Sequence, residues 1–204
     1  MSTLTYIKNL VRDYRIASVT PTSSFGVRWI CDRVDFDASR VIVEFGPGTG
    51  VITEVLLERM RPDARLILVE LNESFVRILR EKFKDPRVSI HQADARNVRQ
   101  ILEAENLDSI DCLITGIPFS YLPDEVRGRI VSETARQMRD GGCFLAYQTI
   151  WQQDRHLLDH LARNFEHTVG TIELRNAPPL RLYMARRCFR TNGHSDNGQL
   201  VRGP

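Results

Sequence analysis

The 204-residue sequence predicts one α/β domain, built on an open and mostly parallel sheet of seven strands with helices on both faces. The first observation is an apolar run, VIVEF over 41–45, that leads directly into GPGTG over 46–50 and then into a helical pattern. The second is the alternation of short apolar runs with amphipathic stretches, which is typical of βαβ units. A chain of this length buries about 70% of its unfolded surface as a single domain, so no second domain is required.

The strands and helices follow from the two periodicities of the apolar residues. Strands are expected at 41–45, 66–71, 88–91, 110–115 and 143–149, with helices near 50–60, 73–83, 97–104 and 123–138. A helix over 151–163 precedes two late strands, 167–174 and 181–187, and the turn residues NAPPL between them predict a hairpin. Ser23 or Ser24 is suited to cap a further helix ahead of the first strand, over the ligand crevice.

The glycine-rich turn indicates a ligand site, because its backbone amides and the N-terminus of the following helix face the end of the strand. The spacing is GxGxG rather than the GxGxxG of dinucleotide-binding turns, and Glu44 would repel a pyrophosphate. S-adenosylmethionine, a cationic nucleoside without phosphate, suits the position better. Glu70 ends the next strand, twenty residues after Gly50, where an acid accepts ribose hydroxyls. Asp94 closes the third strand, where it can meet the adenine amino edge.

Each of these acids alone is most often a solvated helix cap, but the turn with three acids resembles the class I S-adenosylmethionine-dependent methyltransferases. The resemblance implies a Rossmann-like fold with one late antiparallel strand. It also implies the cofactor-binding positions Glu44, Gly46, Pro47, Gly48, Gly50, Glu70, Leu71, Asp94, Ala95 and Gly116. No metal is expected, since His156 and His160 lie four residues apart on a helix without a third ligand.

The segment after the fourth strand, DCLITGIPFSYLP, borders the transferred methyl group in this class of enzymes. Enzymes that methylate the exocyclic amines of bases commonly have Asn or Asp there, followed by Pro and an aromatic residue. Here the segment reads Gly116, Ile117, Pro118, Phe119, so the side-chain amide is missing and a backbone carbonyl faces an aromatic-lined slot. This counts against an adenine acceptor and favours an aliphatic amine.

The sequence also resembles, over residues 1–190, the bacterial phosphatidylethanolamine N-methyltransferases of the soluble, single-domain type. The resemblance rests on the basic N-terminal helix and on VTPTSS, EFGPGTGVIT, GIPFSYLP and NAPPLRLYMARR. It implies stepwise methylation of phosphatidylethanolamine toward phosphatidylcholine. Three alternatives stay open: an rRNA adenine acceptor, a small soluble amine, and a binding module without turnover. The rRNA adenine dimethyltransferases, however, usually carry the Asn motif and a further helical domain.

The candidate catalytic residues would hold the amine in line with the methyl group or take its proton: Gly116, Ile117, Tyr121 and Tyr147. Four aromatic residues can hold methylated ammonium groups by cation–π attraction: Phe119, Tyr121, Tyr147 and Trp151. Core packing is the commoner role for Phe119 and Trp151. The lipid phosphate is expected to contact three residues on one face of the last strand: Arg181, Tyr183 and Arg187. The alternative for these three is a solvated edge strand.

Residues 1–20 are expected to bind a membrane. An apolar arc bordered by cations runs along a helical wheel of this segment, with Leu4, Ile7, Leu10, Val11 and Tyr14 in the arc and Lys8, Arg12 and Arg15 beside it. Such a helix can lie in the headgroup layer of an anionic membrane. A helix docked on its own domain has the same pattern, so both interpretations stay open. The catalytic domain is expected over 21–190 and a disordered tail over 191–204.

The composition predicts the surroundings of the protein. Four cysteines without a CxxC pair indicate a reducing cytosol. No apolar run approaches the roughly eighteen residues that span a bilayer, so a peripheral protein at the inner face of the cell membrane is expected. A net charge of +2 does not indicate a nucleic-acid partner. The expected partners are anionic membrane lipids and phosphatidylethanolamine, and the soluble form is expected to be a monomer.

Overall fold

The computed structural model describes residues 23–152 and 155–188. The two terminal segments predicted as a membrane-binding helix (1–20) and a disordered tail (191–204) therefore lie outside the described residues. In the part of the chain that is described, no helix combines the length and the apolar character needed to cross a bilayer.

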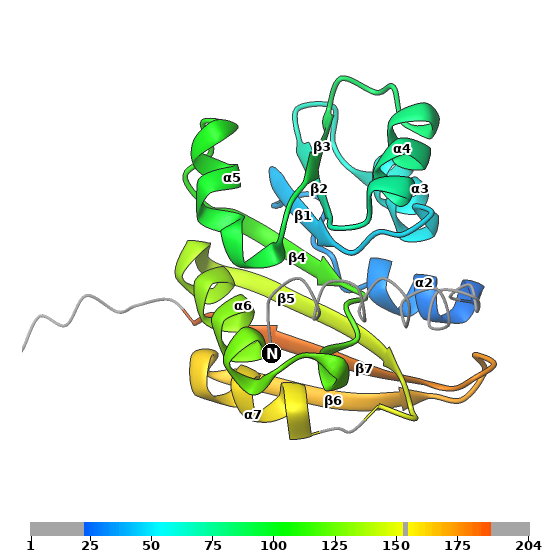
Figure 1. Ribbon diagram of the computed structural model, residues 1–204, viewed down its shortest axis with the longest axis vertical. Coiled ribbons are helices and arrows are strands. Elements are labelled where there is room, and N and C mark those ends of the chain that lie inside the picture. Colours follow the sequence, from blue (N-terminus) through cyan, green and yellow to red (C-terminus); the bar gives the residue numbers. More distant parts are fainter. Residues whose placement is uncertain (1–22, 153–154, 189–204) are drawn as a thin grey trace, which may run out of the picture.

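A seven-stranded sheet forms the centre of the domain in the order β3-β2-β1-β4-β5-β7-β6 (Figure 1). Its strands are β1 Val41–Phe45, β2 Arg65–Glu70, β3 Val88–Gln92, β4 Ile110–Thr115, β5 Met138–Thr149, β6 His167–Glu173 and β7 Leu180–Arg186. Neighbours from β3 to β5 pair in parallel, whereas β7 pairs antiparallel with both β5 and β6. The predicted mostly parallel sheet, its late antiparallel strand and the hairpin are confirmed.

The ends of the parallel strands define two edges of the sheet. We refer to the edge where β1 to β5 end as the carboxyl edge and to the opposite one as the amino edge. The turn between β6 and β7 also lies at the carboxyl edge, because Leu180 pairs with Thr149 at the end of β5 and with Glu173 at the end of β6. The segments that follow β1 to β5 and the β6–β7 turn therefore lie at one edge of the molecule (Figure 1).

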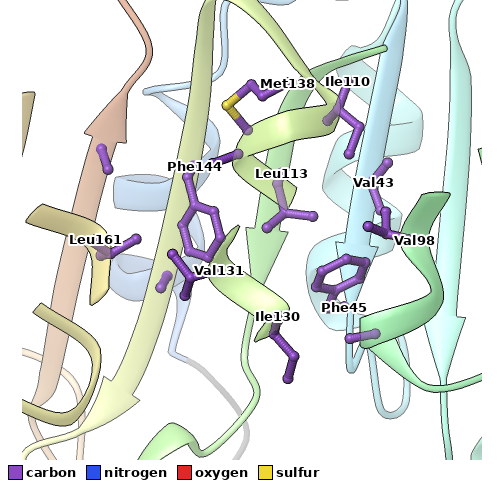
Figure 2. Close-up of a cluster of buried hydrophobic side chains, with 14 of the residues drawn as sticks. Val43, Phe45, Val98, Ile110, Leu113, Ile130, Val131, Met138, Phe144 and Leu161 are labelled. Atoms are coloured by element: carbon purple, nitrogen blue, oxygen red, sulfur yellow. The ribbon is translucent and has the colours of Figure 1, made fainter. Parts of the chain in front are cut away.

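Helices cover both faces of the sheet, as predicted. One face packs against α2 Ser24–Cys31, α3 Val51–Arg59 and α4 Glu73–Lys82, and the other against α5 Val98–Ala104, α6 Asp124–Gln137 and α7 Arg155–Asn164. The apolar residues of α6 and α7 recur three or four positions apart, so each helix buries one stripe. Figure 2 shows Val131 of α6 and Leu161 of α7 beside Phe144 of β5. Each such side chain contributes about 1.5–3 kcal/mol when it is buried.

Strand β5 is longer than the sequence predicts. It begins at Met138 rather than at residue 143, because Gly141 and Gly142 remain within the strand instead of ending it. Gly141 has a φ of +77°, and the pairing of β5 with β4 shifts register nearby. The double glycine is therefore an irregularity inside β5 and does not end the strand. Glycine within a strand often marks an irregularity of this kind.

Two further expectations are corrected. Helix α7 begins at Arg155, so Trp151 lies in a turn and not on the helix predicted from 151. Strand β7 lies between β5 and β6, so the interpretation of 181–187 as a solvated edge strand is wrong. The predicted cap is confirmed: the Ser23 side chain accepts a hydrogen bond from the Gly26 N–H at the start of α2.

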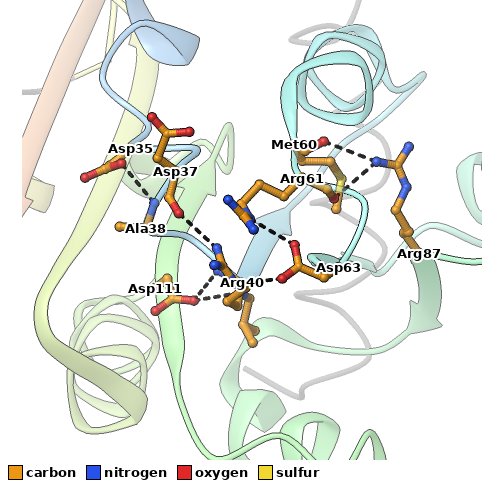
Figure 3. Close-up of polar contacts among 10 residues, drawn as sticks. Asp35, Asp37, Ala38, Arg40, Met60, Arg61, Asp63, Arg87 and Asp111 are labelled. Carbon is orange, nitrogen blue, oxygen red and sulfur yellow. Dashed lines mark hydrogen bonds and ion pairs between the residues drawn. The ribbon is translucent and has the colours of Figure 1, made fainter.

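Polar contacts fix the amino edge (Figure 3). The Asp111 carboxylate accepts hydrogen bonds from the backbone N–H groups of Arg40 and Val41 at 2.6 and 2.7 Å. The Arg40 guanidinium pairs with Asp63 at 3.0 Å, and Arg87 donates to the Met60 carbonyl at 3.2 Å. These contacts hold the start of β1 against the neighbouring segments at the amino edge. The glycine turn and the strand-end acids lie at the opposite edge.

Candidate active site

The turn between β1 and α3 needs glycine at three positions. Gly46, Gly48 and Gly50 all have left-handed backbones, with φ values of +66°, +58° and +80°. Other residues pay a steric penalty there. At Gly50 a Cβ would also lie 2.5 Å from the Cε2 atom of Phe83. The alternate spacing of the glycines thus follows from the path of the backbone, which leaves β1 and turns directly into the N-terminus of α3.

Glu70 stands at the end of β2 and is held by the backbone around it. One carboxylate oxygen accepts a hydrogen bond from Gly48 N–H at 3.2 Å and the other from Asn72 N–H at 2.9 Å. Burial raises the pKa of Glu70, and these N–H groups partly oppose the shift. Glu70 is only 4% exposed and lines a cavity at the carboxyl edge of the sheet. Its orientation is therefore set before any ligand binds.

Glu44 is the most deeply buried acid of the site. It points to the face that carries α3, where one of its oxygens accepts a hydrogen bond from Thr53 Oγ1 at 2.6 Å. Its other oxygen, Oε1, is buried without a hydrogen-bond partner among the described residues. Burial raises the pKa of Glu44 to about 7; the Thr53 hydroxyl opposes this shift and the charge of Glu70 adds to it. A buried carboxyl with a spare acceptor suits a nearby cation.

This cavity lies beside the strand-end acids at the carboxyl edge. It encloses about 600 Å³, part of it open to solvent, between polar groups on one side and apolar side chains on the other. Its lining is Gly46, Val69, Glu70, Leu71, Asn72, Ala93, Asp94, Ala95, Ile117, Pro118, Leu122, Val126 and Ile130. Of the ten predicted cofactor positions, the cavity thus brings together Gly46, Glu70, Leu71, Asp94 and Ala95. Of the other five, Pro47, Gly48 and Gly50 belong to the turn after β1, Glu44 lies in β1 and contacts α3, and Gly116 follows β4 and packs on Tyr147 outside the lining of the cavity.

Asp94 caps the short helix η1 (Ala95–Asn97) by accepting from Arg96 N–H at 2.9 Å. Its carboxylate also pairs with the Arg96 guanidinium at 2.8 Å. Burial alone would raise the pKa of Asp94, but these hydrogen bonds outweigh it and the pKa is lowered. Asp94 is therefore a fixed anion at the wall of the cavity. The apolar wall and the fixed acids suit a nucleoside that carries a positive charge and no phosphate.

The acceptor segment lies against Tyr147 of β5. A Cβ at Gly116 would lie 2.3 Å from the Tyr147 hydroxyl oxygen, so the phenol packs directly on the Gly116 backbone. Ile117 N–H donates to Thr115 Oγ1 at 3.1 Å, which fixes the path of the chain after β4. The structure thus brings together three of the four candidate catalytic residues, Gly116, Ile117 and Tyr147. Tyr121, the fourth, lies in η2 (Phe119–Tyr121) and is 57% exposed.

The other predicted acceptor residues are dispersed. Phe119 is fully buried in the cluster beneath α6 and α7, so its ring packs in the core, whereas Trp151 is 73% exposed. Tyr183 is 1% exposed in the same cluster as Phe119. Arg181 lies near the carboxyl edge, paired in register with Gln148. Arg187 lies at the amino edge, where it donates to the carbonyl of Met138 at 2.9 Å. The structure therefore does not bring Arg181, Tyr183 and Arg187 together around one group.

Gln148 is a residue that the sequence reasoning missed. It lies on the same face of β5 as Ala146, is 3% exposed, and neither its side-chain oxygen nor its nitrogen has a partner among the described residues. Nearby, Ser120 of η2 donates to Gln152 at 3.2 Å. The sequence does carry a signal for Gln148, because it is a lone amide in the otherwise apolar run CFLAYQ. A buried amide normally has a hydrogen-bond partner, so such a position indicates a polar contact.

Within residues 23–152 and 155–188, no three His, Cys, Asp or Glu side chains come together as metal ligands. His160 is 6% exposed and its ring contacts Asp124 at 3.0 Å, which ties α7 to α6.

The fold and the site together define a Rossmann-like enzyme with a nucleoside cavity at the carboxyl edge of its sheet. Comparison with known proteins agrees. A family model described as a methyltransferase domain matches residues 42–142. The chain is 30% identical over 173 residues to an ornithine lipid N-methyltransferase of Singulisphaera acidiphila, and the match covers 84% of this chain and 88% of that protein. The chain therefore belongs to the class I S-adenosylmethionine-dependent methyltransferases.

Other similarities are partial or concern the fold alone. The ribosomal RNA small subunit methyltransferase A of Geobacter metallireducens is 46% identical over 66 residues, but the match covers 32% of this chain and 23% of that protein. Among solved structures, an O-methyltransferase from Bacillus cereus in complex with SAH has a TM-score of 0.62 at 13% identity, covering 89% of this chain and 91% of that one. TomG from Streptomyces achromogenes, in complex with SAM, has a TM-score of 0.60 at 14% identity, covering 89% of each chain.

Proposed function

We propose that this protein transfers methyl groups from S-adenosylmethionine to the amine of a phospholipid headgroup, phosphatidylethanolamine, stepwise toward phosphatidylcholine. The observation that carries the proposal is the acceptor segment, in which Gly116 presents only backbone and packs on the Tyr147 phenol. With glycine at position 116, the segment lacks the Asn or Asp side chain that would hold the exocyclic amine of a base, whereas an aliphatic amine needs only an acceptor atom and a desolvated slot. The match to a lipid N-methyltransferase along most of both chains supports a lipid amine as the acceptor.

In this proposal the cofactor half of the site is formed by the three acids. Glu70 accepts the ribose hydroxyls, Asp94 lies at the adenine edge, and the spare oxygen of Glu44 faces positive charge. When bound, S-adenosylmethionine supplies a methyl group on a positively charged sulfur. The residues of this chain hold its nucleoside and leave the reacting side open toward Gly116 and Ile117, which border the end of β4.

The acceptor amine must lose its proton before it can attack. An alkylammonium has a pKa near 10, so its deprotonation costs about 3–4 kcal/mol at pH 7. A slot between apolar and aromatic side chains lowers that cost, because it disfavours the charged amine. In this proposal the Tyr147 hydroxyl, which packs on Gly116, relays the proton. The exposed Tyr121 ring offers a cation–π face to methylated products.

The proposal is tested with isotopically labelled S-adenosylmethionine and the full chain. Four acceptors are offered separately: vesicles with phosphatidylethanolamine, vesicles with ornithine lipid, ribosomal RNA, and ethanolamine in solution. We expect label in mono-, di- and trimethylated phosphatidylethanolamine. Label in ornithine lipid alone would mean that ornithine lipid, and not phosphatidylethanolamine, is the acceptor. Label in RNA or free ethanolamine alone would reject a lipid substrate. Tyr147→Phe serves as the variant that should bind cofactor normally yet methylate more slowly.

A further inference from the structure

Exposed apolar side chains gather at the carboxyl edge, on segments that follow β4 and β5 and on the neighbouring β6–β7 turn and α2. Trp151 after β5 is 73% exposed and Leu174 in the β6–β7 turn is 74% exposed. Tyr121 of η2 is 57% exposed, and Phe25 at the start of α2 is 41% exposed. Single exposed apolar residues need no explanation, but large ones grouped on one edge do. We refer to Phe25, Tyr121, Trp151 and Leu174 as the apolar rim.

Direct contacts join the elements that carry the rim. The segment with Tyr121 is linked to the turn after β5 by the hydrogen bond from Ser120 to Gln152, next to Trp151. That turn is linked in turn to the β6–β7 connection, because Ile150 N–H donates to the Pro179 carbonyl at 3.0 Å. The rim is thus built on neighbouring strand ends.

The β6–β7 turn is also tied to the start of α2. The Arg175 guanidinium lies 4.6 Å from the centre of the Phe25 ring. Ser23 N–H donates to the Asn176 side chain at 2.6 Å. Phe25 and Leu174 therefore belong to one surface, although about 150 residues separate them in the sequence.

Cations accompany the rim. Arg28 is exposed on α2, and Arg175 is 65% exposed beside Phe25. Arg175 pairs with Glu173, which is only 7% exposed, so the guanidinium is the member of this pair that faces solvent. Residues 1–22 join the described chain at Ser23, on this same edge, and their sequence carries the basic amphipathic pattern. Aromatic and aliphatic groups beside arginines fit the headgroup layer of an anionic bilayer, where rings sit between the acyl chains and the phosphates.

We propose that the apolar rim is a membrane-docking surface: Trp151 and Leu174 enter the interfacial layer of an anionic bilayer, flanked by Tyr121 and Phe25, so that the segment after β4 faces the lipid headgroups. The inference rests on the proposed function for its purpose, since a lipid amine reaches Gly116 most directly when this edge lies on the membrane. Its evidence is the exposure, contacts and charge of the rim, and its test does not need methyl transfer.

The chain contains two tryptophans, so Trp29→Phe leaves Trp151 as the sole tryptophan reporter. The full chain carrying this change is mixed with vesicles of phosphatidylcholine and phosphatidylglycerol whose acyl chains carry bromine, without phosphatidylethanolamine and without cofactor. We expect quenching of Trp151 fluorescence and a shift of its emission to shorter wavelength. Leu174→Ser in the wild-type background should weaken vesicle binding about tenfold or more. Ile78→Ser is the matched control, because Ile78 is 39% exposed on α4, away from the rim, and should bind as wild type.

Three results would overturn the docking surface. The protein does not bind anionic vesicles; it binds them while Trp151 stays unquenched; or Trp151 already emits at short wavelength without vesicles, as it would if residues 1–22 covered the rim. Quenching without any methylation of phosphatidylethanolamine would instead leave the docking surface standing and reject the proposed acceptor. Failure of one proposal is therefore distinguishable from failure of the other.

Discussion

The two halves of the carboxyl edge differ in how far their polar groups are hydrogen-bonded and how far their apolar side chains are buried. At the ends of β2 and β3 the acids are held by hydrogen bonds, as Glu70 is by the N–H groups of Gly48 and Asn72, and Glu44 in β1 accepts from Thr53 but keeps one buried oxygen without a partner among the described residues. At the ends of β4 and β5 and in the β6–β7 turn, Trp151 and Leu174 lie in solvent, while the buried amide of Gln148 has no partner among the described residues. The first half is largely enclosed and holds its acids at fixed positions, whereas the second half exposes large apolar side chains to solvent.

This difference matches the sizes of the two substrates. A nucleoside cofactor is small enough to be enclosed, so its cradle is built in advance and holds its acids at fixed positions. The phospholipid of the proposed function would stay in its bilayer, so the half that receives it would need an open edge, and the membrane would supply the missing contacts. The comparison makes separate predictions for each half, and variants of the cofactor half should produce the largest effects.

The strongest effect is expected at Glu70. In Glu70→Gln the amide nitrogen must face a backbone N–H, either that of Gly48 or that of Asn72, and a charged acceptor for the ribose is lost. Hydrogen bonds to charged groups contribute about 1.5–3 kcal/mol each, so cofactor affinity should fall about 100-fold or more. Titration calorimetry with S-adenosylmethionine and with its demethylated product measures the loss. Glu73→Gln, an exposed acid in the first turn of α4, is the control, and equal affinities in the two variants would contradict the assignment.

The next effect is a dependence of stability on pH that originates at Glu44. Its pKa is raised to about 7 by burial, above the value of an exposed glutamate, so the folded protein binds a proton more tightly than the unfolded chain does. Stability should therefore be highest below about pH 4.5 with respect to this group and should fall as the pH rises toward 7. The full loss is about 3 kcal/mol.

Glu44→Gln should remove that pH dependence and weaken the binding of the cofactor. Urea unfolding at pH 5 and pH 8 without ligand should show a smaller difference for Glu44→Gln than for wild type, while cofactor affinity falls because the anion that faces the cation is lost. Glu58→Gln on the exposed side of α3 provides the control. An unchanged pH dependence in Glu44→Gln would mean that Glu44 is not the group that titrates.

The cofactor half was also the half that the sequence could predict. Strands that are buried on both faces leave continuous apolar runs, so β1 and β4 were predicted with the bounds that the structure has. Left-handed turns demand glycine, and acids at successive strand ends mark one crevice. Each of these signals is local in the chain. The predicted Gly46, Glu70 and Asp94 therefore meet in one cavity, as their positions at the ends of β1, β2 and β3 required.

The acceptor half depends on contacts between distant segments, and there the sequence was a poorer guide. Period two placed Arg181, Tyr183 and Arg187 on one face, which is correct, but the face is covered by α6 and α7 and the strand extends to the amino edge. No local pattern reports that α7 starts only after Trp151, or that Phe25 meets Arg175. Periodicity gives the direction of a side chain, and only packing gives what it meets.

The smallest effect should isolate the acceptor half. Gly116→Ala forces a methyl group against the Tyr147 ring and hydroxyl, which should destabilise the protein by about 1–3 kcal/mol. Tyr147→Phe cannot relieve the clash, because the ring carbon Cζ would also lie 2.5 Å from the new Cβ. Tyr147→Ala can. In a double-mutant cycle followed by urea unfolding, the Gly116→Ala, Tyr147→Ala pair should lose about 1 kcal/mol less than the sum of the single variants.

The matched control is Gly170→Ala on β6, where the nearest atoms, those of Tyr183, would lie at an ordinary 3.6 Å. Gly170→Ala should change the free energy of unfolding very little, and its effect should add to that of Tyr147→Ala. Gly116→Ala should also slow methyl transfer while cofactor affinity stays close to wild type, because the displaced phenol belongs to the acceptor and not to the nucleoside cavity. If Gly116→Ala weakened cofactor binding as much as Glu70→Gln does, the two halves would not be separable. The cofactor half and the acceptor half would then have to be treated as one site.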